Sequence, residues 1–260
     1  MYPFWLEIDP FQIGSYEIGG FRAPTFGPMV VLAFLVAYWV LKKEFIRKSI
    51  DPELASSILT AAIVGGLVGA KLYFVLFEVP AGAGFTGLIS ALFSGSGLTW
   101  YGGFLVATVW IVWLTKRRGV SVRAVADAAG MGLAIGYGVG RIGCQLAGDG
   151  DYGIPTDLPW GMAYPNGVVP TFDTVHPAPV YETLAGAAIF GVLWKVRTRL
   201  ATPGMLFCLY LILSGVARFS VEIIRLNPIV MFGFTGAQLI SLALVALGVV
   251  GALYLSRRSV

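Results

Sequence analysis

Arg141 is the residue of this chain whose type and position most clearly suggest chemistry. It lies in the stretch 140–149, at the outer end of an apolar run that leads into the longest polar segment. An arginine inside a membrane helix costs about 2.5 to 3.5 kcal/mol at the bilayer centre and less near the surface. An anionic ligand would offset that cost, because a guanidinium binds phosphate through two parallel hydrogen bonds. The alternative is that Arg141 reaches the interface or pairs with Asp127 or Asp149.

A second arginine, Arg218, shares a helix face with Glu222, four residues later, and with Ser214, four residues earlier. Arg225, seven residues on, lies near the same face. Arg218 and Glu222 could form a purely structural ion pair. Ionisable side chains inside a membrane bundle also commonly face a cavity and serve function, so the pair could instead orient the arginine toward a ligand.

His176 is the only histidine of the chain and begins the segment 176–182. The two prolines of this segment favour an extended backbone before a helix whose first turn holds Tyr181 and Glu182. His176 is therefore either an interfacial residue ahead of the helix or an acid or base at neutral pH. Cys144 and His176 could also form a thiol enzyme, unless Cys144 is inert.

The composition is typical of a polytopic membrane protein. The chain has 260 residues, 57% hydrophobic and 12% charged, with a mean hydropathy of +0.80, whereas soluble domains carry about 25% charged residues. We expect an all-α helix bundle that forms a single domain over residues 1–260, without a cleavable signal peptide. Seven transmembrane spans are predicted, with a polar loop over 144–177. The spans are residues 26–41, 54–77, 101–115, 125–142, 178–194, 204–224 and 234–255.

The basic residues predict the orientation of these spans. Of the 18 lysines and arginines, 13 follow the first, third, fifth and seventh spans, which places those ends in the cytoplasm and the N-terminus outside. The net charge of +4 is therefore a topology signal and does not indicate nucleic-acid binding. Lys71 could pair with Glu78 or with a lipid phosphate. The basic residues outside this pattern are Arg22, Lys71, Arg141, Arg218 and Arg225.

Glycines occur at two kinds of position. Spacing by four residues places several of them on one helix face, where they favour close helix packing. Tyr101 precedes a Gly-Gly pair at the start of the third span, and this pair would let a lipid or a backbone approach closely. Trp100 and Tyr101 could equally belong to an interfacial aromatic belt. The spaced glycines are Gly65, Gly69, Gly132, Gly136 and Gly140, and the pair is Gly102 and Gly103.

Taken together and in this order, these segments resemble the prolipoprotein diacylglyceryl transferase family. The resemblance covers most of the chain and implies a seven-span enzyme of the bacterial plasma (inner) membrane, with its N-terminus outside and its C-terminus in the cytoplasm. It is carried by Gly102-Gly103, Asp127, Gly140-Arg141-Ile142-Gly143, Gly148-Asp149, residues 155–165, His176-Pro177, Tyr181-Glu182, residues 218–222 and Gly236-Ala237-Gln238.

The resemblance implies transfer of the diacylglyceryl group from phosphatidylglycerol to the lipobox cysteine thiol of prolipoproteins, with release of glycerol phosphate. The implied partners are phosphatidylglycerol, prolipoprotein signal peptides with a lipobox cysteine, and membrane lipids. No metal, soluble cofactor or nucleic acid is implied. Arg141 and Arg218 would hold the phosphate and stabilise its charge, with Tyr101 as the third catalytic residue. The implied substrate-binding residues are Gly102, Gly103, Cys144, Asp149, His176, Tyr181, Glu182 and Glu222.

The chain also departs from the family pattern. Tyr101 stands where the family usually has a histidine that is thought to assist proton removal, and a neutral tyrosine is a poorer proton acceptor. Cys144 replaces an asparagine, Asp149 a longer acidic residue, and Ser214 and Phe26 replace tyrosines. These departures leave open a non-catalytic or altered-specificity paralogue that binds anionic phospholipid. A transporter of small anions is disfavoured, because the two halves show no repeat.

Overall fold

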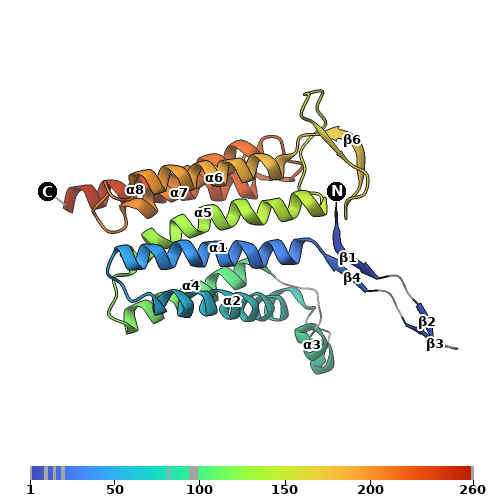
Figure 1. Ribbon diagram of the computed structural model, residues 1–260, viewed down its shortest axis with the longest axis horizontal. Coiled ribbons are helices and arrows are strands. Elements are labelled where there is room, and N and C mark those ends of the chain that lie inside the picture. Colours follow the sequence, from blue (N-terminus) through green and yellow to red (C-terminus); the bar gives the residue numbers. More distant parts are fainter. Residues whose placement is uncertain are drawn as a thin grey trace. The chain divides into compact units, whose positions relative to one another are not determined.

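The computed structural model describes residues 2–8, 11–13, 16–18, 21–80, 82, 84–93 and 99–258. They form eight α-helices, one π-helical segment and short strands (Figure 1). The chain divides into two compact units, one of Met1–Val40 with Ala126–Val260 and the other of Leu41–Val125. The prediction of a single domain stays a prediction, and each unit is described by itself.

The first unit holds the helices that carry most of the candidate site. Its core consists of buried apolar side chains from four of its helices. These core residues are Val40, Met131, Ala134, Leu193 and Leu206. The helices of this unit are α1 (Phe26–Arg47) as far as Val40, α5 (Val122–Ala147) from Ala126, α6 (Ala178–Val196), α7 (Met205–Glu222) and α8 (Gly236–Arg258).

The second unit contains α2 (Glu53–Tyr73), which continues into the π-helical segment η1 (Phe74–Glu78), followed by α3 (Gly84–Phe93) and α4 (Trp100–Arg117). Lys71 Nζ donates a hydrogen bond to the carbonyl oxygen of Ala91 at 3.2 Å. This contact ties α2 to α3 and was not among the partners predicted for Lys71.

Four antiparallel strand pairs lie among the described residues, so the fold is mostly helical rather than all-α. Most of these strands lie in the segments that precede the first predicted span or connect later ones. The pairs are β1 (Phe4–Ile8) with β4 (Phe21–Pro24), β2 (Phe11–Ile13) with β3 (Tyr16–Ile18), β5 (Met162–Tyr164) with β6 (Thr171–Val175), and β7 (Ile229–Met231) with β8 (Phe234–Thr235).

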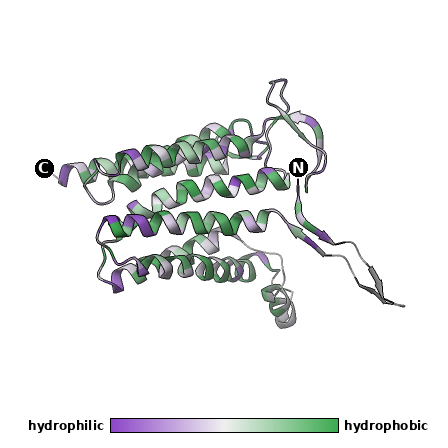
Figure 2. Cartoon of the chain, viewed as in Figure 1, coloured by the Kyte–Doolittle hydropathy of each residue, from purple (hydrophilic) through white to green (hydrophobic). Residues whose placement is uncertain are grey.

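Each predicted span coincides with a helix, to within a few residues, and the second coincides with α2 and η1 together. Figure 2 shows many hydrophobic residues along the long helices. Three helices in the described part of the chain are long and apolar enough to cross a membrane, namely Glu53–Glu78, Met205–Glu222 and Gly236–Arg258. The polar loop begins later than predicted, because α5 continues through Cys144 to Ala147.

The close packing predicted at spaced glycines is confirmed on α5 for two of the three. A β-carbon at Gly132 would lie 3.1 Å from the carbonyl oxygen of Ala37, and one at Gly136 would lie 3.3 Å from that of Ala33. These glycines therefore let α5 lie close to α1. The prediction is wrong for Gly140, where an added β-carbon meets none of the described atoms within 4 Å.

The Gly-Gly pair at the start of α4 packs against α2. A β-carbon at Gly102 would lie 2.3 Å from the carbonyl oxygen of Gly69, and one at Gly103 would lie 2.7 Å from that of Gly66. A β-carbon at Gly65 would lie 3.1 Å from an α4 backbone atom. The pair thus lets a backbone approach, which is one of the two alternatives raised from the sequence. Lipid contact at these glycines stays a prediction.

Asp127 of α5 caps the N-terminus of α7. Its Oδ2 accepts a hydrogen bond from the backbone N–H of Gly204, and its Oδ1 accepts one from that of Phe207, both at 3.0 Å. The first turn of a helix leaves its N–H groups without helical partners, and a carboxylate there also interacts well with the helix dipole. The buried carboxylate therefore fixes α7 against α5.

We expect Asp127→Ala to lower the free energy of unfolding by about 1 to 2 kcal/mol, the usual loss for a removed helix cap. Thermal unfolding of the detergent-solubilised protein, followed by circular dichroism, measures this loss. Asp157→Ala is the matched control, because Asp157 is an exposed carboxylate in the polar loop. Equal stability of the two variants would contradict a capping role for Asp127.

Candidate active site

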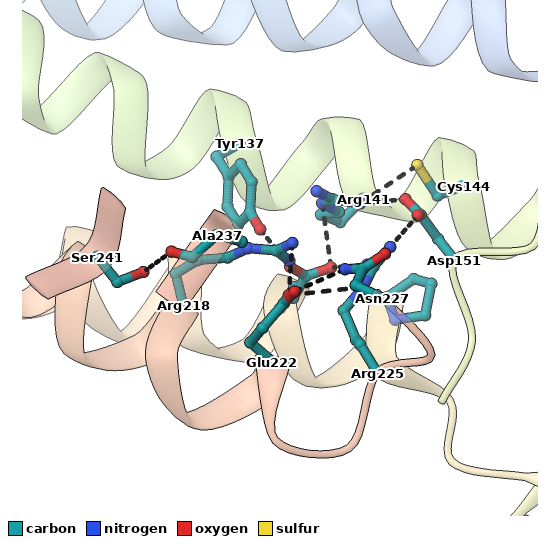
Figure 3. Close-up of polar contacts among 12 residues, drawn as sticks. Tyr137, Arg141, Cys144, Asp151, Arg218, Glu222, Arg225, Asn227, Ala237 and Ser241 are labelled. Atoms are coloured by element: carbon teal, nitrogen blue, oxygen red, sulfur yellow. Dashed lines mark hydrogen bonds and ion pairs between the residues drawn. The ribbon is translucent and has the colours of Figure 1, made fainter. Parts of the chain in front are cut away.

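Three arginines and three carboxylates form one cluster in the first unit, and Figure 3 shows most of its members. Helix α5 supplies one arginine, α7 supplies an arginine and a carboxylate, α6 supplies a carboxylate from its first turns, and the segments after α5 and α7 supply the rest. With all six ionised, the cluster has no net charge. Its arginines are Arg141, Arg218 and Arg225, and its carboxylates are Asp151, Glu182 and Glu222.

Glu182 is the centre of the cluster. Its Oε1 accepts hydrogen bonds from Arg218 Nη1 and from the hydroxyl of Tyr137, both at 2.5 Å. Its Oε2 lies 3.1 Å from Arg141 Nε and 3.5 Å from Arg225 Nη1. Only 2% of this side chain is exposed, and burial of a charged group is costly unless close partners compensate it. Glu182 therefore brings together the guanidinium groups of Arg141, from α5, and Arg218, from α7.

Glu222 confirms the helical spacing seen in the sequence. Its Oε2 lies 2.7 Å from Arg218 Nη2, four residues earlier on α7. Its Oε1 accepts hydrogen bonds from Asn227 Nδ2 at 2.7 Å and from Thr235 Oγ1 at 2.8 Å. Arg218 is consequently held from two sides, by Glu182 and by Glu222, and its planar fork has a fixed orientation.

Asp151 reaches the cluster from the polar loop, where it forms ion pairs with both Arg141 and Arg225. Its backbone N–H donates to Asp149 Oδ1 at 3.3 Å. Burial raises the pKa of Asp151, but the charges of the two arginines and their hydrogen bonds outweigh that effect and hold its pKa below the ordinary value. Arg141 thus pairs with Asp151 and Glu182, rather than with Asp127 or Asp149 as the sequence suggested.

The lowered pKa of Asp151 determines how its contribution to folding stability changes with pH. A carboxyl with a depressed pKa in the folded state stabilises the fold fully above its unfolded pKa, near 3.9, and loses that contribution as the pH falls toward the folded value. We therefore expect the stability difference between the unaltered protein and Asp151→Asn to be constant above about pH 5 and to shrink below about pH 4. Thermal unfolding between pH 3 and pH 7 measures it. A difference that grew on acidification would contradict the pairing.

Two of the three arginines remain accessible. The exposed fractions of their side chains are 18% for Arg141 and 25% for Arg218, against 9% for Arg225. Among the described residues, Arg141 Nη2 and Arg218 Nε have no hydrogen-bond partner. The Arg141 guanidinium also lies over the Tyr137 ring, 4.9 Å from its centroid, a cation–π contact that fixes its plane. These N–H groups can therefore donate to an anion.

His176 and Tyr181 belong to a neighbouring aromatic group. Tyr181 accepts a hydrogen bond through its hydroxyl from Trp160 Nε1 at 2.8 Å, and the same hydroxyl lies 3.2 Å from His176 Nδ1. Within the described part of the chain, no hydrogen bond joins these three side chains to the arginines. The segment 176–182 thus contributes Glu182 to the arginine–carboxylate cluster and His176 to the neighbouring aromatic group.

Cys144 is buried on α5, with its Sγ 3.9 Å from Arg141 Nη1. The ligand atoms of Cys144, Asp149 and Asp151 lie within 4.8 Å of one another, a grouping that the cysteine spacing did not predict. Asp151 already pairs with two arginines, and their positive charge opposes a cation there. The expectation that no metal takes part stays a prediction.

Tyr101, Gly102 and Gly103 lie in the first turn of α4, in the second unit. The Tyr101 side chain is exposed. Its assignment to catalysis stays a prediction, as do the substrate-binding assignments of the two glycines.

Sequence reasoning missed several members of the cluster. The sequence could have indicated Arg225, because it is one of the basic residues outside the topology pattern. It could also have indicated Thr235, because Thr235 and Gln238 form a capping box at the start of α8. The Thr235 N–H donates to Gln238 Oε1 at 3.0 Å, and the Gln238 N–H donates to Thr235 Oγ1 at 3.2 Å. The residues left out of the predicted site are Tyr137, Asp151, Arg225, Asn227 and Thr235.

The family model for prolipoprotein diacylglyceryl transferases matches residues 14–254. The chain belongs to this family. A phosphatidylglycerol–prolipoprotein diacylglyceryl transferase of Gloeobacter violaceus is 33% identical over 252 residues, covering 94% of this chain and 92% of that protein. Proteins of the same name from Leptospira interrogans (33% identical, 79% of this chain and 72% of that protein) and Geobacter sulfurreducens (30%, 98% and 98%) are also similar.

Family membership confirms the prediction made from the ordered motifs. The protein is a diacylglyceryl transferase of lipoprotein biosynthesis, and it is a polytopic membrane protein. The arginine–carboxylate cluster is the candidate active site of this transferase, because it combines accessible phosphate-binding donors with a buried, rigid support.

Proposed function

We propose that this transferase moves the diacylglyceryl group of phosphatidylglycerol to the lipobox cysteine of prolipoproteins and releases glycerol phosphate. In this step a sulfur–carbon bond forms, a carbon–oxygen bond to the phosphate breaks, and the thiol proton passes to a base. The phosphodiester begins with one negative charge, and the glycerol phosphate that leaves carries a second. Catalysis therefore requires positive groups that are already in place where this charge develops.

Arg141 and Arg218 fit this requirement. Both guanidinium groups are held by Glu182, at 3.1 Å and 2.5 Å, while each keeps N–H groups without a protein partner among the described residues. This shared carboxylate is the observation that carries the proposal. It orients two guanidinium groups from different helices and leaves some of their N–H groups able to donate to phosphate. Arg225 is less exposed and serves mainly to compensate the charges of Asp151 and Glu182.

Tyr101 is the proposed proton acceptor, because it occupies the position where the family usually has a histidine. We expect Tyr101→Phe to lower transfer at least 10-fold and Tyr101→His to retain or raise it, since general-base catalysis contributes about 10²- to 10⁴-fold. The pH dependence of the transfer rate should change with Tyr101→His. Full activity of Tyr101→Phe would exclude this role and leave His176, tested by His176→Ala.

The proposed orientation has seven spans in the bacterial inner membrane, the N-terminus outside and the C-terminus in the cytoplasm. It rests on the distribution of basic residues and on the seven predicted spans that coincide with helices. Single cysteines introduced in the loop after α5 and at the C-terminus of α8 test it. A membrane-impermeant thiol reagent should label the first from outside intact cells and should not label the second.

The transfer assay uses purified protein in phosphatidylglycerol micelles with a lipobox peptide, followed by peptide mass and released glycerol phosphate. The expected result is a diacylglyceryl mass gain that is lost when the peptide cysteine is replaced by serine. Folded protein that binds phosphatidylglycerol without any mass gain would favour the alternative of a non-catalytic or altered-specificity paralogue.

A further inference from the structure

The β7–β8 hairpin, residues 229–235, presents a continuous apolar tip. Four consecutive large side chains, from Ile229 to Phe232, are between 51% and 82% exposed. Phe232 and Gly233 turn the chain with positive φ angles of 54° and 78°. A patch of adjacent exposed large apolar side chains marks an interaction surface, whereas scattered single ones do not.

The sequence around the hairpin indicates the nature of that surface. The hairpin joins α7 to α8, and both helices are apolar and long enough to cross a membrane. No charged residue occurs between Arg225 and Arg257. The tip is therefore continuous in sequence with two membrane helices and lies at the end where both meet the interface.

The backbone of the hairpin suits a lipid environment. Ile229 pairs with Thr235 and Met231 pairs with Phe234, so part of its peptide groups are satisfied within the hairpin. Apolar surroundings penalise peptide groups without partners. A short paired hairpin can therefore enter the boundary between headgroups and acyl chains at a lower cost than an open loop.

The base of the hairpin is fixed to the candidate site. Asn227 precedes it and Thr235 ends it, and both donate to the same oxygen of Glu222. Figure 3 shows Asn227 and Glu222 beside Arg225 at this point. The hairpin therefore has a fixed position relative to Arg218, which pairs with the same Glu222.

We propose that the β7–β8 hairpin inserts its tip into the outer surface of the membrane and binds the boundary of headgroups and acyl chains. The partner is the phospholipid surface itself, through apolar burial rather than charge. The inference goes beyond the transfer reaction and does not depend on it. An alternative partner, the apolar segment of an acceptor peptide, is an outcome of the test.

The test places an environment-sensitive fluorophore on Phe232→Cys, in the full chain reconstituted into phosphatidylglycerol-containing vesicles. Lipids carrying a quencher at a shallow or a deep acyl position report its depth. Phe172→Cys is the matched control, because Phe172 is 83% exposed, is also aromatic and lies in a hairpin, but is followed by Asp173. The unaltered chain, with its buried Cys144 and Cys208, gives the background labelling.

The expected result is quenching of the label at 232 by the shallow quencher, at least threefold stronger than at 172. A photoreactive group at the same cysteine should cross-link to lipid. Equal quenching at both positions would overturn the proposal. Cross-linking mainly to an added lipobox peptide would overturn it in favour of the acceptor.

Discussion

Replacement of Arg218 by lysine should lower diacylglyceryl transfer by about 10²- to 10³-fold, the usual loss when one group that stabilises transition-state charge is removed. Arg218 contacts Glu182 through Nη1 and Glu222 through Nη2. A lysine keeps the charge, but a single ammonium cannot span both carboxylates and present a further N–H group to phosphate. The rate of peptide modification in phosphatidylglycerol micelles measures the loss.

Arg141→Lys should show a loss of the same order, because Arg141 also shares Glu182 and stacks on Tyr137. The two substitutions combined should lose less than the product of the single losses, since residues that act as a unit are not additive. Arg22→Lys is the matched control, as Arg22 forms an exposed ion pair with Glu7. Near-normal transfer by Arg218→Lys, with the protein folded, would show that these arginines do not stabilise the leaving phosphate.

Glu182→Gln should lower the free energy of unfolding by about 3 to 5 kcal/mol, the range for removal of one partner from a buried ionic group. Glutamine keeps the shape of the side chain but removes the negative charge shared by three arginines. The cluster would then hold three positive and two negative charges at low exposure. Chemical or thermal unfolding in detergent measures the change, and lipid binding should weaken with it.

Tyr137→Phe is the comparison that isolates the charge. It removes one hydrogen bond to Glu182 and leaves every ion pair in place, so we expect a loss of about 1.5 to 3 kcal/mol, the range for a hydrogen bond to a charged group. A second control, Glu7→Gln, changes an exposed carboxylate. Similar stability of Glu182→Gln and Glu7→Gln would refute the view that Glu182 is the electrostatic centre of the site.

Neutrality of the cluster has a consequence for phosphate binding. An isolated pair of arginines in an apolar bundle would be costly before the lipid arrives. Asp151, Glu182 and Glu222 lower that cost, and they also orient the guanidinium groups. The phosphate then relies on oriented N–H donors that need not rearrange during the reaction, which is how preorganised sites act.

The sequence by itself determined those features that depend on neighbours along the chain. Helix periodicity places Arg218 and Glu222 on one face, and the ion pair between them forms as expected. Apolar runs of sufficient length predicted the helices, and the ordered motifs predicted the family. Local hydrogen bonds such as the Thr235–Gln238 capping box could have been read in the same way, because they join residues three positions apart.

Only the tertiary structure decided how distant residues meet. Glu182 contacts Arg218 and Tyr137 across separations of 36 and 45 residues, and Asp151 brings Arg225 into the cluster across 74 residues. These contacts depend on how closely the helices approach and how each is rotated about its axis. Gly132 and Gly136, at the contact of α5 with α1, and the Asp127 cap on α7 contribute to this approach and rotation. Spacing along one helix carries no information about them.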